Sequence, residues 1–105
     1  MEDLKVDFSS FVVSLATGAA GALNEVETLR SGKKTGEDGV QQDVSPEEAK
    51  TQSEAALNAA RHLIDTLAMF EEKTKGNLTD AEQQVLHGSL ANLRIAFVKV
   101  ATPTN

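Results

Sequence analysis

The chain has 105 residues, which suits one domain and is too short for two. Its 16 acidic and 10 basic residues give a formal net charge of −6, so we expect no affinity for nucleic-acid phosphates or for anionic lipid. Cysteine is absent, which excludes disulfides, thiolate metal sites and thiol nucleophiles. Hydrophobic residues make up 40% of the chain, and this content predicts a core of small size.

The first predicted element is a helix from Phe8 to about Arg30, with Asp7 as its N-cap. Its large apolar side chains fall within about a third of the helix circumference, which is typical of a helix packed on a core. Small residues line one flank of this helix, at Ser10, Ser14, Gly18 and Gly21. A glycine inside a helix costs about 1 kcal/mol relative to alanine, so we expect another helix to approach closely at this flank.

An uncharged run of 13 residues, from Phe11 to Leu23, lies within this helix. A membrane-spanning helix needs about 20 apolar residues, so the run is too short to cross a bilayer. A secretory signal would have a basic region before the run, whereas residues 1–7 hold three acidic residues and one lysine. We therefore expect a buried helix in a cytoplasmic protein.

The segment of residues 31–44 follows the first helix and holds three glycines with no hydrophobic periodicity. It predicts a flexible loop without strands, longer than a compact domain needs. The whole chain, residues 1–105, is then expected to form one helical domain, with short tails at residues 1–7 and 102–105.

Ser45, Pro46 and Glu48 indicate the start of a second helix. Ser45 is the expected N-cap, Pro46 suits the first turn, and Glu48 is expected to close a capping box. The helix can extend to Lys75, where Gly76 is suited to a left-handed cap.

Thr79 and Glu82 form a second capping box, from which a third helix is predicted to extend to about Ala101. Because the turn before Thr79 is short, the second and third helices are expected to form an antiparallel hairpin. The predicted fold is therefore all-α, with this hairpin packed on the apolar first helix and a long loop between the first and second helices.

The residues that could carry chemistry are few. His62 and Asp65 lie three residues apart on the second helix, but a metal site needs three or four converging ligands. His87 is expected on the polar side of the third helix, so both histidines are expected to be solvated. Glu71 and Glu72 are sequence neighbours and point about 100° apart, which prevents them from flanking one substrate. We expect no catalytic residue, no metal site, no cofactor and therefore no enzyme.

Two observations favour contact with another protein chain. The first is the small-residue flank, and the second is a set of apolar residues outside the predicted core faces; together they give the candidate interface residues Ser14, Gly18, Gly21, Met69, Ile95 and Val98. With so small a core, they favour self-association as a homodimer, with an unidentified protein partner as a further possibility. The small flank could instead be filled by the chain's own hairpin.

A different class of function is a peripheral membrane protein that uses residues 8–23 as an apolar helix. Such helices usually carry a basic face, which this segment lacks. The interaction module is therefore the preferred hypothesis.

Three stretches resemble a known family. These are the run from Phe8 to Ala16, the run from Ala60 to Asp65, and the sequence Glu-Lys-Thr-Lys-Gly-Asn-Leu-Thr from Glu72 to Thr79. They are similar to a bacterial family known as domain of unknown function 1844. The resemblance implies a short, helical, cytoplasmic protein without an assigned activity, and it supplies no catalytic residues. The long segment before Ser45 departs from the family, in which a shorter connection is expected.

Overall fold

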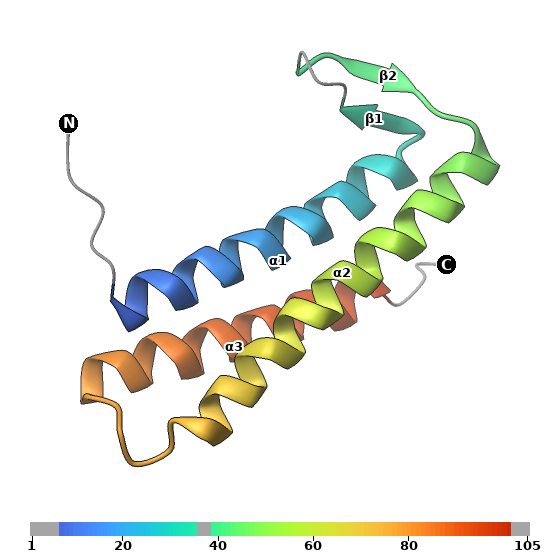
Figure 1. Cartoon of the computed structure of the whole chain (residues 1–105). Helices are drawn as coiled ribbons and strands as arrows, with labels where there is room; N and C mark the ends of the chain where they lie inside the picture. Colours follow the sequence, from blue (N-terminus) through green and yellow to red (C-terminus); the bar gives the residue numbers. More distant parts are fainter. Residues whose placement is uncertain (1–6, 36–38, 102–105) are drawn as a thin grey trace.

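The computed structural model describes residues 7–35 and 39–101, and it consists mainly of three helices (Figure 1). In chain order the elements are α1 (Phe8–Arg30), β1 (Lys33–Thr35), β2 (Gln41–Asp43), α2 (Pro46–Lys73) and α3 (Asp80–Ala101). Helix α1 packs on both α2 and α3, which confirms the predicted all-α arrangement. The predicted tails, apart from Asp7, lie outside the described residues.

Helix α1 begins and ends where its sequence predicts. The Asp7 side chain accepts the backbone N–H of Ser10 at 2.8 Å, which is the expected N-cap. Its buried residues follow the helical period, and they are Val12, Ala19, Leu23, Val26 and Leu29. Most of the apolar face of α1 is therefore buried inside the molecule, whereas Phe11 is 50% exposed.

The core consists of two clusters that follow each other along the helices. The cluster nearer the α2–α3 turn contains Val12, Ala19, Ile64, Leu67, Leu86, Leu90 and Leu93. The other cluster is built from smaller side chains, and it contains Leu23, Val26, Ala56, Ala60 and Val100. The second cluster includes two alanines of α2. Because a methyl side chain takes up less space than a leucine side chain, α1 and α2 can pack more closely there.

The segment of residues 31–44 is more ordered than its sequence predicts. Strands β1 and β2 pair antiparallel, with Lys33 opposite Asp43, so the expectation of a loop without strands was wrong. The ammonium of Lys33 forms an ion pair with Asp43 across the strands. The N–H of Val44 donates to the carbonyl of Gly32 at 2.9 Å, and Gly32 has a φ of 85°. Polar cross-strand pairs and a left-handed glycine hold this hairpin, and neither gives a hydrophobic pattern in the sequence.

The β hairpin is tied to the start of α2. Lys34 Nζ lies 2.8 Å from Glu48 Oε1, and the same oxygen accepts a hydrogen bond from Gln52 at 3.0 Å. The Ser45 half of the predicted capping box forms, because Ser45 Oγ accepts the Glu48 N–H at 3.1 Å. The Glu48 carboxylate, which was expected to cap the same turn, is instead turned toward the hairpin.

The α2–α3 turn lies at the opposite end of the molecule from the β hairpin (Figure 1). Helix α2 ends at Lys73, two residues before the predicted end, and the chain then turns, with the Asn77 N–H donating to the Thr74 carbonyl at 2.8 Å. Gly76 has the predicted left-handed conformation, with a φ of 86°. The second capping box forms in both directions: Thr79 N–H donates to Glu82 at 2.8 Å, and Glu82 N–H donates to Thr79 Oγ1 at 3.1 Å.

Candidate functional site

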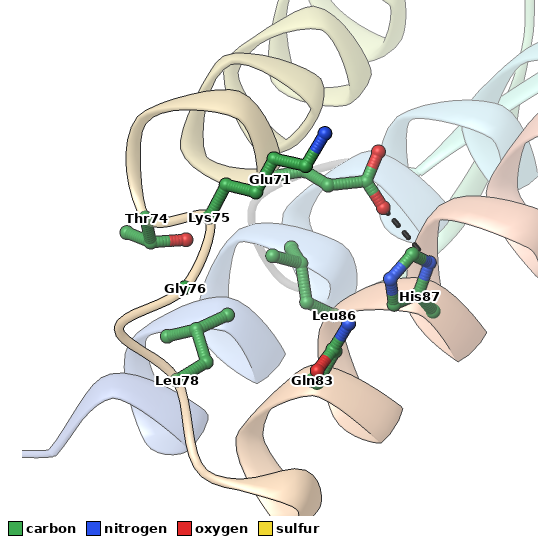
Figure 2. A pocket seen from close by; sticks show the side chains of 8 residues that line it. All are labelled: Glu71, Thr74, Lys75, Gly76, Leu78, Gln83, Leu86 and His87. Carbon is green, nitrogen blue, oxygen red and sulfur yellow. Dashed lines mark ion pairs between the residues drawn. The ribbon is translucent and has the colours of Figure 1, made fainter.

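A pocket of about 290 Å³ lies at the α2–α3 turn (Figure 2). It is lined by Glu71, Thr74, Lys75, Gly76, Leu78, Gln83, Leu86 and His87. Leu78 and Leu86 point into the hollow between the turn and α3, so its floor is apolar and its rim is polar. The turn that shapes this pocket is fixed locally by Gly76 and by the Thr79 capping box.

The polar rim contains a contact between His87 and Glu71 that joins α2 to α3. His87 Nδ1 lies 2.9 Å from Glu71 Oε2, and the two side chains are 56% and 34% exposed. His87 is exposed, as predicted, and it also contacts Glu71, which the sequence did not predict. The two residues are 16 positions apart in sequence, and their pairing depends on the register of the helical hairpin. His62 stays exposed, as predicted.

The chemistry open to this pair is limited. When the Glu71 carboxylate accepts a hydrogen bond from Nδ1–H of a neutral His87, the Nε2 atom of His87 is left as a hydrogen-bond acceptor. A histidine in this arrangement can act as a general base. The hydroxyl that lines the same pocket belongs to Thr74, and it donates to the Phe70 carbonyl at 2.6 Å. That hydroxyl is thus already engaged by the backbone of α2. The geometry supports a clamp between two helices better than a catalytic pair.

Metal ligands do not converge in the described part of the chain. Across residues 7–35 and 39–101, no three side chains of histidine, cysteine, aspartate or glutamate come close enough to hold a metal ion.

A second hollow runs between α2 and α3. It has a volume of about 270 Å³ and is lined by Arg61, Ile64, Asp65, Arg94, Phe97 and Val98; we call these six residues the α2–α3 groove. The guanidinium of Arg61 lies 5.3 Å from the centroid of the Phe97 ring, which is a cation–π distance. Ile64 is 7% exposed and forms part of the floor. The groove is therefore an apolar strip with three charged residues along it.

The structure separates the predicted interface residues into two groups. Ile95 and Val98 come together on α3 beside the α2–α3 groove, with 66% and 62% of their surfaces exposed. Met69 is 44% exposed on α2 and does not line that groove. The off-core apolar residues thus form one patch of two neighbours and one isolated side chain.

The small flank of α1 is partly filled by the chain itself. A Cβ atom placed on Gly18 would lie 3.3 Å from Leu63 Cδ1 of α2, so the close approach at this glycine is within one chain. A Cβ on Gly21 would meet nothing within 4 Å, and the Ser14 hydroxyl donates to the Ser10 carbonyl at 3.0 Å. The sequence predicted a close approach at this flank, but it did not show that the residue opposite Gly18 is Leu63 of the same chain.

Among the residues that the structure describes, no helix has the length and apolar character needed to cross a bilayer.

Comparison with known proteins gives a family. The model of a family described as domain of unknown function (DUF1844) matches residues 5–99. No curated protein and no solved structure matches the chain. The resemblance expected from the sequence is therefore confirmed, and it covers all three helices almost completely.

Proposed function

Because the chain belongs to the domain of unknown function (DUF1844) family, whose description names no activity, we propose its function from the geometry. The proposal is that the protein is a helical interaction module that associates with itself as a homodimer. One observation carries it, namely the exposed pair Ile95 and Val98 on α3. No catalytic residue is part of this proposal.

The exposed pair is suited to contact with another chain. Ile95 and Val98 are three positions apart, so their side chains are neighbours on the helix surface. They adjoin a groove whose floor includes Ile64 and Phe97, which makes the apolar area continuous. Full burial of a valine or isoleucine side chain contributes about 1.5–3 kcal/mol. In a symmetric dimer each contribution is made twice, which favours self-association over an isolated exposed surface.

The membrane hypothesis has less support. A helix that binds a membrane surface presents its apolar face to lipid. In this chain the apolar face of α1 is buried against α2 and α3, through residues such as Val12 and Leu23. The exposed residues between positions 8 and 24 of α1 are uncharged and mostly small, with Phe11 and Val13 as large exposed side chains, and Glu25, Glu27 and Arg30 place charges on the exposed surface of its last turns.

Sedimentation equilibrium over about a hundredfold range of protein concentration tests the proposal. We expect a reversible monomer–dimer equilibrium. Val98→Ser removes apolar surface that the dimer buries twice, at about 0.8 kcal/mol per methylene, so the dissociation constant should rise by about tenfold or more. Val13→Ser is the matched control, because it makes the same change at a valine of similar exposure on α1.

Two outcomes would contradict the proposal. A monomer at every concentration would remove self-association as the function. Flotation of the unmodified protein with lipid vesicles, abolished by Val13→Ser and unaffected by Val98→Ser, would support the membrane hypothesis in its place.

A further inference from the structure

We propose that a second copy of this chain covers the α2–α3 groove with two-fold symmetry, so that Asp65 of each copy faces Arg94 of the other. This inference rests on the proposed self-association and names the surface and the contacts that would produce it. The apolar part of the contact comes from Ile95 and Val98.

The charges of the groove are the first argument. Arg61 lies over the Phe97 ring and keeps its charge, so the groove holds two basic residues and one acidic residue, and Asp65 and Arg94 are the pair of opposite sign outside that ring contact. Within the described residues, neither Asp65 nor Arg94 forms an ion pair. Both side chains are exposed and line the same hollow. The groove thus offers an acceptor and a donor that the single chain leaves unmatched.

Symmetry is the second argument. In a two-fold dimer the same surface is used by both copies, so a contact from residue i to residue j is repeated from j to i. A surface with one acidic and one basic residue satisfies this condition with itself, because each aspartate can meet an arginine of the other copy. A surface with a single sign would repel its own copy. The pair Asp65 and Arg94 therefore fits a second copy of this chain.

The helix contacts are the third argument. Among the three helices, α2 and α3 contact each other least, and α1 contacts both of them more extensively. Helix α1 therefore covers one side of the hairpin, and the groove opens between the two less closely packed helices. The outer face of α1 is a poorer candidate for the dimer contact, because it carries no charge from Phe8 to Asn24. The space beside Gly18 is also occupied by Leu63 of the same chain.

Charge reversal at the two residues tests the inference. After Asp65→Arg, every charged residue of the groove is basic. After Arg94→Asp, the groove holds two carboxylates and one basic residue, Arg61. Each variant alone places like charges opposite each other, so its dissociation constant should rise by about tenfold or more. Mixing the two variants opposes arginines to aspartates at both contacts. We expect the mixture to sediment as a heterodimer with affinity close to that of the unmodified protein.

Controls keep the test independent of folding. Both residues are exposed, so far-ultraviolet circular dichroism should show unchanged helicity in each variant. Glu25→Arg is the matched control, because it makes the same change of charge at an exposed residue of α1, and it should leave the dimer unaffected.

The outcomes separate this inference from the proposed function. If the unmodified protein dimerises and neither reversal weakens it, the dimer forms through another surface and the inference is overturned. If both reversals weaken the dimer and the mixture does not restore it, the two residues do not face each other, which also overturns the inference. A monomeric unmodified protein would instead overturn the proposed function on which the inference rests.

Discussion

Gly18→Leu is the substitution whose effect the structure predicts most directly. A Cβ at this position would lie 3.3 Å from Leu63 Cδ1, and the remaining carbons of leucine would extend into the space that α2 occupies. Overpacking of this kind costs about 1–3 kcal/mol. Replacement of a helical glycine returns roughly 0.8 kcal/mol of helix propensity. We therefore expect a variant that is less stable than the unmodified protein by about 0–2 kcal/mol.

Gly21→Leu is the matched control for this prediction. It makes the same change in the same helix, where a Cβ would meet nothing within 4 Å. It should gain the propensity of about 0.8 kcal/mol without the overpacking cost, so the two variants should differ by about 1–3 kcal/mol. For a domain of this size that difference corresponds to a gap of several degrees in melting temperature.

Thermal unfolding followed by circular dichroism measures the gap between the two leucine variants. The comparison is made at two protein concentrations, because a contact within one chain gives a difference that does not depend on concentration. Equal melting temperatures for Gly18→Leu and Gly21→Leu would refute the close approach of α1 to Leu63. Loss of dimer in Gly18→Leu alone would show that the glycine contacts a second chain.

Three further predictions concern the turn, the aromatic residues and the hairpin. Thr79→Ala removes the cap that accepts the Glu82 N–H and should cost about 1 kcal/mol in urea unfolding, with no cost if α3 begins elsewhere. Phe70→Ala removes a ring whose centroid lies 5.5 Å from that of Phe11, and it should cost about 2 kcal/mol by the same assay. Hydrogen bonds from Lys33 and Lys34 lower the pKa of Asp43 and Glu48 from their ordinary values of 3.8 and 4.5. Because both folded-state pKa values are lowered, the hairpin contacts are complete above the ordinary values and are lost as the pH falls through the lower ones. Backbone amide chemical shifts of residues 41–44, recorded from pH 6 to pH 2, should show this loosening, and Glu48→Gln should remove the part of it that belongs to the contact with α2.

The helix boundaries show how much local sequence determines. Asp7, Ser45 and Thr79 were each predicted as caps, and each accepts a backbone N–H of the first helical turn. A cap needs a side chain and a backbone group three residues apart, so the information lies in adjacent positions. The left-handed Gly76 follows from the same reasoning, since glycine takes this conformation at no steric cost.

The β hairpin and the start of α2 show where local sequence patterns fail to predict the structure. Glu48 was predicted to cap its own helix, but Lys34 competes for the same carboxylate from 14 residues away. Strands β1 and β2 show no alternation of apolar and polar residues, because charged side chains and backbone hydrogen bonds support their pairing. Pairings of this kind depend on which residues the fold brings together, and the hydrophobic period does not record them.

The same distinction between local sequence and tertiary structure applies to the candidate site. The sequence by itself determined which residues are apolar outside the core faces, so Ile95, Val98 and Met69 could be named in advance. Only the tertiary structure decided that Val98 lines one groove with Asp65 and Arg94, and that Gly18 contacts Leu63 of its own chain. The physical reason is that helical period fixes the face a residue occupies, whereas the rotation and separation of two packed helices fix which faces meet.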